Sequence, residues 1–151
     1  MDKPSDYSEI ISLLDKDQKV QTQNTERLLA ENKPIARIIG VHSDSRAANI
    51  KAKDMMHLKP VLHICIGAKV MLRHNLSVRD GLVNGAEGYV RDIIWDHSKT
   101  IDHLPRSIVV EFPQYSGPQL LPGPKSYAKM IPLVPRRAEC DDRGTSRTRL
   151  Q

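Results

Sequence analysis

The fold of this 151-residue chain is decided by the stretch Gly67-Ala-Lys-Val-Met-Leu-Arg-His-Asn-Leu-Ser-Val-Arg-Asp-Gly-Leu-Val-Asn-Gly-Ala-Glu-Gly-Tyr-Val90. Its apolar residues 70–72 predict a strand, which continues into a polar and basic loop over residues 73–80. The glycines that follow fall where a chain must turn sharply. The stretch therefore predicts a strand, a basic loop and a glycine-rich hairpin.

The turn residues of this stretch form a structural signature. The pair Asn84-Gly85 favours a two-residue hairpin turn, because both central positions of such a turn require positive φ. Gly88 allows a bulge or a close backbone approach. Gly81, after Asp80, is a further turn signal, and Gly67 separates two strand-like runs. The plain interpretation is that these residues shape turns and contact no ligand.

The loop over residues 73–79 carries two guanidiniums, an amide and an imidazole, which are donors suited to phosphate oxygens. We take as candidate nucleic-acid contacts Lys69, Arg73, His74, Asn75 and Arg79. The alternative is an ordinary solvated loop. Tyr89 and Trp95 have rings that can stack on bases. Because only 4% of the residues are aromatic, core filling is the favoured role of both.

The bulk composition limits what the chain can be. Its length allows one domain, or one domain with tails. With 39% hydrophobic residues, we expect a modest aliphatic core, and ten prolines and eight glycines predict many turns and loops. The net charge of +5 suits a polyanionic partner, because phosphate contacts release counterions. Charge alone does not separate this from a basic protein that binds no nucleic acid.

The cysteines and the N-terminus indicate the compartment. Cys65 and Cys140 form no CxxC pair, which fits a reducing environment without structural disulfides. The first residues lack the apolar core of a signal peptide, and no run approaches the roughly 18 apolar residues of a membrane span. We expect a soluble, intracellular protein with no membrane partner.

The sequence gives no sign of an active site or a metal centre. The six histidines do not pair at helical spacing, and Cys65 beside His63 lacks a second ligand pair, so we predict no metal site. No nucleophile elbow of the Gly-x-Ser-x-Gly kind occurs. The phosphate-binding Gly-x-x-x-x-Gly-Lys-Ser/Thr loop is also missing, as is an Asp-Glu strand end for magnesium. We predict no catalytic residue and no cofactor, and expect the chain alone to hydrolyse nothing.

The remaining chain reads as helix followed by short strands. Residues 1–33 are predicted helical, and residues 42–60 are predicted to be an exposed connector. Strand-like runs are residues 35–41, 61–66, 69–72, 89–95, 107–112 and 130–134. We divide the chain into a helical segment (1–34), a strand plus a small β-barrel (35–135) and a basic, disordered tail (136–151). The predicted class is α+β, mainly β.

Several motifs resemble the Pif-type and Helitron-type DNA helicases, relatives of the RecD helicases. The strongest is Gly67 to Val90, which is similar to the segment leading into their small β-barrel. The resemblance also rests on Gln23-Asn-Thr-Glu-Arg-Leu28, Lys33-Pro-Ile-Ala-Arg-Ile-Ile-Gly-Val-His-Ser43, Glu111-Phe-Pro-Gln-Tyr-Ser-Gly-Pro118, Ile131-Pro-Leu-Val-Pro-Arg136 and Ser146-Arg-Thr-Arg-Leu-Gln151. Residues 13–19 depart from the family pattern, because they lack its usual Thr-Asn sequence after a strand.

The resemblance implies a fragment of an ATP-dependent 5′-to-3′ DNA helicase that acts in DNA repair or recombination. It would cover the end of the second RecA-like domain, a P-loop NTPase fold, and the inserted Src-homology-type barrel. ATP and magnesium would belong to the full-length family, whose ATP-coupling motifs are absent here. The implied partners are single-stranded or forked DNA and the remaining helicase domains, and the location would be the nucleus in a eukaryote.

Two other interpretations stay open. The first is a barrel that binds proteins, although few aromatic residues are available for a groove that holds proline-rich ligands. The second is a truncated gene product with no independent function, destabilised by exposed sheet edges.

Overall fold

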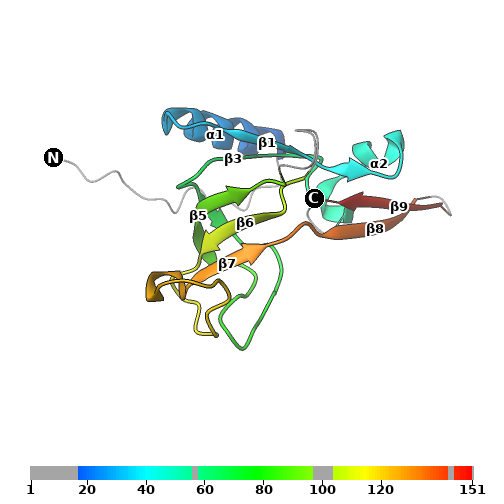
Figure 1. The fold of residues 1–151 in the computed structure, drawn as a ribbon. Helices are drawn as coiled ribbons and strands as arrows, with labels where there is room; N and C mark the ends of the chain where they lie inside the picture. Colours follow the sequence, from blue (N-terminus) through cyan, green and yellow to red (C-terminus); the bar gives the residue numbers. More distant parts are fainter. Residues whose placement is uncertain (1–16, 56–57, 97–103, 143–144, 151) are drawn as a thin grey trace.

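A computed structural model describes residues 17–55, 58–96, 104–142 and 145–150 of the chain. It is mainly β, with a helix ahead of short strands (Figure 1). The helical elements are α1 (Asp17–Ala30), α2 (Ser45–Asn49) and the 3-10 helices η2 (Ala52–Met55) and η3 (Lys125–Tyr127). The strands are β1 (Ala36–Ile39), β2 (Val41–His42), β3 (Val61–Ile64), β4 (Lys69–Met71), β5 (Glu87–Ile94), β6 (Ser107–Glu111), β7 (Met130–Leu133), β8 (Arg137–Asp142) and β9 (Thr145–Leu150). The mainly β class predicted from the sequence is confirmed.

Each strand-like run of the sequence contains or overlaps one of these strands, namely β1, β3, β4, β5, β6 and β7 in chain order, and β5 begins two residues before its predicted run. Helix α1 lies within the predicted helical segment, whose residues 1–16 fall outside the described residues. Leu29 of α1 is 64% exposed. None of the described helices is long and apolar enough to cross a membrane.

The centre of the molecule is an antiparallel four-stranded sheet with the order β4-β5-β6-β7. Its inner face carries cross-strand neighbours such as Val90, Val110 and Ile131, all of them buried. Phe112, the single phenylalanine of the chain, follows β6 and is fully buried in the same cluster. The antiparallel pair β1-β3 adds Ile38 and Ile64 to this core. The aliphatic core predicted from composition thus also includes aromatic rings, of which Phe112 is fully buried.

The outer face of this sheet is polar and is held by ion pairs between neighbouring strands. Lys69 Nζ of β4 lies 2.7 Å from Glu87 Oε2 of β5, and Arg91 of β5 contacts Glu111 of β6. Opposite charges on adjacent strands stabilise the pairing modestly, because both partners stay partly solvated. One face therefore packs on the core and the other meets solvent, as is usual for an antiparallel sheet.

The expected Src-homology barrel is not confirmed. The described strands form three separate sheets, β1-β3, β2-β9-β8 and β4-β5-β6-β7, and none of them closes on itself. The reason lies in β8, the strand after β7. It pairs with β9 over its whole length instead of closing the sheet against β4.

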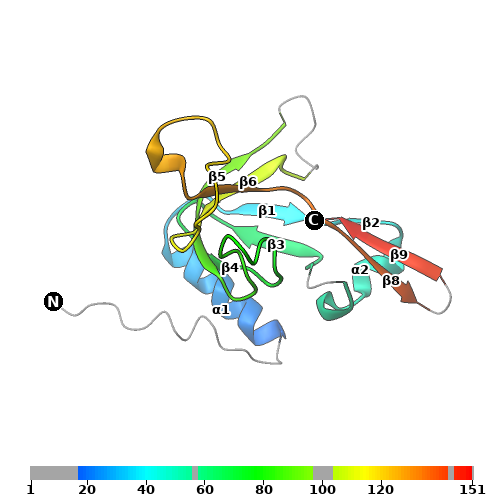
Figure 2. The same ribbon diagram turned by 90° about the horizontal axis from the view of Figure 1, so that it is seen from below.

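The expected disordered tail is not what the structure shows, because residues 137–142 and 145–150 form the hairpin β8–β9. Strand β9 also pairs with β2, at the start of the predicted connector 42–60, and that connector contains α2 and η2. Ala47, Met55 and Ala138 are fully buried together. Both views place α2, β8 and β9 together at one side, away from η3 (Figures 1 and 2). The predicted connector (residues 42–60) and the predicted tail (residues 136–151) therefore pack against each other.

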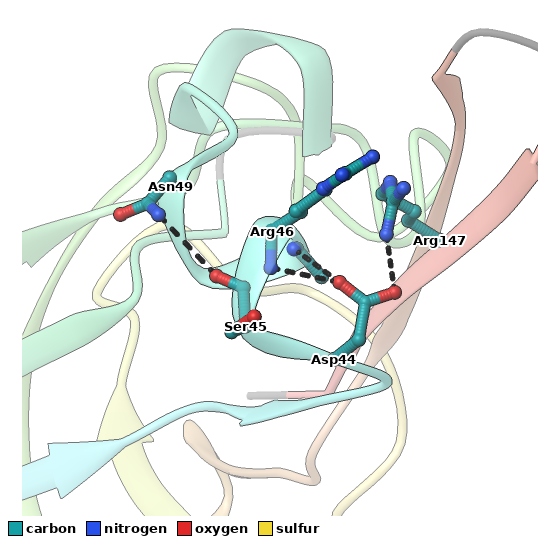
Figure 3. Close-up of polar contacts among 6 residues, drawn as sticks. Asp44, Ser45, Arg46, Asn49 and Arg147 are labelled. Atoms are coloured by element: carbon teal, nitrogen blue, oxygen red, sulfur yellow. Dashed lines mark hydrogen bonds and ion pairs between the residues drawn. The ribbon is translucent and has the colours of Figure 1, made fainter.

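One buried arginine joins these two segments. The Asp44 carboxylate accepts hydrogen bonds from the backbone N–H groups of Arg46 and Ala47 and so caps α2. Its other oxygen forms an ion pair with Arg147 of β9, whose side chain is almost fully buried (Figure 3). The backbone N–H of Ala47 is the main cause that lowers the pKa of Asp44, and Arg147 lowers it further. Asp44 lies in the predicted exposed connector and Arg147 in the predicted disordered tail, so this pairing was not predicted from the sequence.

Candidate nucleic-acid interface

The candidate interface is the tip loop, which we define as residues 72–86 between β4 and β5. Leu72 and Ala86 extend the strand pairing, since Leu72 N–H donates to Ala86 O at 2.9 Å and Gly85 N–H to Leu72 O at 2.8 Å. Leu72, Leu82 and Ala86 are buried in the main core. The base of the loop is therefore anchored by apolar contacts as well as by backbone hydrogen bonds.

The outer part of the tip loop is a small hairpin of its own. Ser77 and Leu82 form an antiparallel bridge, with Leu82 N–H donating to Ser77 O at 2.8 Å. The Ser77 hydroxyl donates to Asp80 Oδ2 at 2.6 Å and braces the turn from inside. Val78 and Arg79 stand at the outermost position of this turn and are exposed. The conformation of the tip is therefore stabilised by hydrogen bonds that do not involve the side chain of Arg79.

The predicted hairpin turn at Asn84-Gly85 is wrong in its type and place. Within the described chain, only Gly85 of the pair has positive φ, at 92°. Ala86 N–H donates to Val83 O at 2.9 Å, and positive φ at the third residue alone is the pattern of a type II turn. The hairpin is instead reversed at residues 78–81, where Gly81 has φ 84°. The pair was misassigned because the loop contains two successive turns.

Two further signature glycines, Gly67 and Gly88, lie at positions where the backbone is constrained. Gly67 has φ 90° and its N–H donates to Val90 O at 2.7 Å. Gly88 permits the close approach expected of it, because a Cβ there would lie 2.7 Å from Glu111 O. The bulge itself lies further along β5, between Val90 and Asp92.

The structure separates the five predicted contact residues. Arg73 and Arg79 are exposed on the tip loop and, among the described residues, neither forms an ion pair. Lys69 lies instead on β4, in the ion pair with Glu87. The role of each as a DNA contact stays a prediction, but the charge of Lys69 is already balanced within the chain.

His74 and Asn75 are neither as free as the two arginines nor held in an ion pair like Lys69 in the described structure. His74 is half-buried, and its Nε2 atom is shielded from solvent. Asn75 is exposed, and its Oδ1 accepts the backbone N–H of Asn84 at 2.7 Å. The amide oxygen of Asn75 therefore shapes the loop, which leaves its NH₂ group as the donor available to a ligand.

Two exposed apolar side chains of the loop were not predicted from the sequence. Leu76 is 46% exposed and Val78 is 67% exposed, so the tip presents carbon surface between its arginines. The alternation of these residues with polar neighbours could have indicated this, because one face of a small hairpin must point outward. An exposed apolar tip flanked by guanidiniums can contact bases while the charges contact phosphates.

Core filling was predicted for both Tyr89 and Trp95, and the structure confirms it for only one of them. Trp95 packs against the main core. Tyr89 is 39% exposed on the outer face of the sheet, where the guanidinium of Arg91 lies 5.9 Å from its ring centre. The prediction for Tyr89 is therefore wrong, because strand alternation directs its ring away from the core.

The tip loop is supported from outside by the segment after β6. Ser116 N–H donates to Asp80 O at 3.1 Å, and a Cβ on Gly81 would lie 2.9 Å from Gln114 O. Tyr115 is buried, and its hydroxyl donates to Pro118 O at 2.8 Å. Burial raises the pKa of Tyr115, and the nearby Asp80 carboxylate raises it further. The phenol therefore stays neutral and keeps this support in place.

A metal site finds no support in the described part of the chain, where no three side chains of histidine, cysteine, aspartate or glutamate gather.

The sequence of this region matches a known domain. Residues 50–93 match the family model described as DNA helicase Pif1, 2B domain. The matched residues include β3, β4, the whole tip loop and most of β5. No curated protein sequence matches the chain.

Solved structures of several Pif1 helicases match this chain. The crystal structure of Pif1 helicase from Candida albicans matches with a TM-score of 0.60 at 18% identity, over 90% of this chain and 32% of that chain. Pif1 from Bacteroides sp in complex with ADP-AlF4 matches with a TM-score of 0.48 at 15% identity, over 85% of this chain and 26% of that one. A structure titled for DNA unwinding at forked dsDNA by two coordinating Pif1 helicases gives 0.47 at 16% identity, over 86% and 24%.

The chain spans about a third of the length of the Candida helicase and about a quarter of the other two. Only the Candida structure supports a comparison of folds. Together with the 2B-domain match over residues 50–93, it shows a fold similar to part of a Pif1 helicase.

Proposed function

We propose that this chain is part of an ATP-dependent 5′-to-3′ DNA helicase and that its tip loop contacts single-stranded or forked DNA. The observation that carries the proposal is Arg79, an exposed cation at the end of a hydrogen-bonded turn. It lies within the residues that match the 2B domain.

The electrostatics of the tip favour a phosphate backbone as the ligand. The residues from Gly67 to Arg79 include three lysines or arginines and no aspartate or glutamate. Arg73 and Arg79 are exposed, and a guanidinium offers several donors in a plane that fits phosphate oxygens. Since both charges are free of ion pairs in the described structure, DNA binding does not first have to break one.

The apolar side chains of the tip supply a second kind of contact. Leu76 and Val78 are exposed to water in the chain as described, and covering them with a base or sugar removes apolar surface from water. A single strand offers unstacked bases for this purpose, whereas a closed duplex does not. The combination therefore favours single-stranded DNA, or the single-stranded arm of a fork.

The parts needed for motor activity lie outside this chain. ATP and magnesium would be bound by other domains of the parent helicase, because the phosphate-binding loop is absent from the sequence. The remaining helicase domains are the proposed protein partners, and the nucleus is the proposed location in a eukaryote. The chain alone would bind DNA without hydrolysing ATP.

A salt-dependent anisotropy titration with a labelled oligonucleotide tests the proposal. We expect the double variant Arg73→Ala/Arg79→Ala to weaken binding at low salt. The slope of log K against log salt is negative, and its magnitude should decrease by about 1.4, because each of the two lost phosphate contacts to a single strand contributes about 0.7. The matched control is Arg37→Ala/Arg106→Ala, which removes two exposed arginines away from the tip loop.

The control should bind with nearly the slope of the unmodified chain. Absence of binding at low salt, or equal losses in the two double variants, would contradict the proposal. Equal losses would mean that net charge alone attracts the oligonucleotide.

A further inference from the structure

A second loop lies at the same end of the central sheet as the tip loop. Because the order β4-β5-β6-β7 is antiparallel throughout, β4 and β6 run in the same direction. The connections that follow these two strands therefore leave the sheet at one end. The second connection is residues 112–129, which we call the β6–β7 loop, and Figure 1 shows it beside the tip loop below the sheet.

The two loops are joined by direct contacts. Ser116 N–H donates to Asp80 O at 3.1 Å, and Gln114 packs against the Cα of Gly81 at the turn of the tip loop. Lys129 closes the base of the second loop by donating to the carbonyl oxygen of Pro113. A ligand held at the tip therefore has an ordered neighbouring surface along which to continue.

The β6–β7 loop presents an aromatic ring that is fixed from behind. Tyr127 ends η3, and its N–H donates to Pro124 O at 2.9 Å. Its ring lies against Gly123, where a Cβ would come within 2.6 Å of the ring carbon Cδ2. The side chain is nevertheless 37% exposed. The ring is thus held against backbone and open to solvent, which is the arrangement of a stacking platform.

The charge of this loop has one sign only. Residues 112–129 contain two lysines and no aspartate, glutamate or arginine. Lys125, in the same turn of η3 as Tyr127, is exposed. A cation two residues from an exposed ring pairs a phosphate contact with a base contact, as in proteins that bind single strands without reading their sequence.

We propose that the β6–β7 loop is a second binding site for single-stranded nucleic acid, in which Tyr127 stacks on a base and Lys125 contacts the adjoining phosphate. This inference rests on the proposed function insofar as the strand is expected to continue from the tip loop. The two sites are otherwise separate, because no residue of the second site belongs to the tip loop.

The test uses the full 151-residue chain and a labelled oligothymidylate in the anisotropy titration. Loss of one base–aromatic stack should weaken binding about tenfold in Tyr127→Ala. Tyr127→Phe keeps the ring and should bind like the unmodified chain, whereas Tyr127→Leu covers Gly123 without a π face and should bind like Tyr127→Ala. Lys125→Ala should lower the salt slope by about 0.7. Circular dichroism melts identify any variant that has lost its fold.

The outcomes separate the two proposals. If Arg73→Ala/Arg79→Ala weakens binding while folded Tyr127→Leu binds normally, the tip loop binds DNA and the second site is overturned. If Tyr127→Leu weakens binding and the arginine double variant does not, the second site stands and the tip-loop proposal is wrong. If Tyr127→Phe is as weak as Tyr127→Leu, the hydroxyl and not stacking is responsible, which overturns the inference. No binding by the unmodified chain overturns both.

Discussion

The central sheet and the C-terminal sheet of this molecule are stabilised in different ways. The central sheet β4-β5-β6-β7 covers a continuous core that includes Phe112 and side chains from β1 and β3. The sheet β2-β9-β8 covers a small cluster around Ala47, Met55 and Ala138, together with the ion pair between Arg147 and Asp44. Hydrophobic burial is non-directional, whereas an ion pair depends on geometry and pH. The loops that carry the proposed function extend from the first of these sheets.

The largest effect should come from removing the fully buried ring of Phe112 from the core that the first sheet covers. Phe112→Ala should lower the free energy of unfolding by about 3–5 kcal/mol, because it removes a fully buried ring and leaves a cavity. Urea denaturation followed by far-UV circular dichroism measures the change. Val134→Ala is the control, since Val134 is 70% exposed and its truncation should change stability by less than about 0.5 kcal/mol. Equal effects of the two variants would mean that the described core is wrong.

The second effect should be confined to the C-terminal sheet. Arg147→Met removes the buried cation that bonds Asp44, and we expect a loss of about 2 kcal/mol in the stability of this sheet. Amide hydrogen exchange should show the loss of protection in β8 and β9 and little change in β5 and β6. Arg137→Met changes an exposed arginine of the same sheet and serves as the control. Uniform loss of protection across both sheets would show that they unfold as one unit.

A smaller effect should distinguish backbone strain from contact within the tip loop. Gly81 and Gly85 have similar positive φ values, 84° and 92°, but only Gly81 has a neighbour, Gln114 O, within reach of an added Cβ. Gly85→Ala should therefore cost about 1 kcal/mol from strain alone, and Gly81→Ala about 2 kcal/mol. Thermal unfolding of the two variants measures the difference. Equal costs would show that the β6–β7 loop does not support the tip.

Much of the first sheet could be predicted from the sequence, because its strands are short runs of β-branched residues between glycines and prolines. Val70, Val90 and Val110 follow this rule, and each lies in a predicted strand. The basic tip loop was also located correctly, together with both of its exposed arginines. Local pattern was sufficient there because the residues that define each element are neighbours in sequence.

The second sheet could not be predicted in this way. Strand β8 has the sequence Arg-Ala-Glu-Cys-Asp-Asp, in which only small side chains are available for burial, and its partners in the packed cluster lie in residues 47–58. Asp44 and Arg147 are separated by 103 residues, so that no local pattern indicates their pairing. Tyr127 escaped notice for a related reason, since its fixed ring depends on Gly123 and on the turn of η3. Strand β8 and the exposed ring of Tyr127 both depend on contacts between residues distant in sequence or on local backbone geometry, which a pattern of residue types does not show.

The smallest effect should be a pH dependence that belongs to the C-terminal sheet alone. The pKa of Asp44 is lowered below 3.8 in the folded chain, chiefly by the backbone N–H of Ala47, so that the folded state favours the ionised carboxylate. A group with a lowered folded pKa stabilises the fold above its unfolded pKa, and this contribution is lost as the pH falls through the folded value. Hydrogen-exchange protection of β8 and β9 should therefore decrease below about pH 4, relative to β5 and β6. Asp44→Asn keeps the helix cap but carries no charge, so its β8–β9 protection should start lower and decline less over the same pH interval. An equal decline in Asp44→Asn would assign the acid sensitivity to other carboxylates and would remove the ion pair as the distinguishing support of the second sheet.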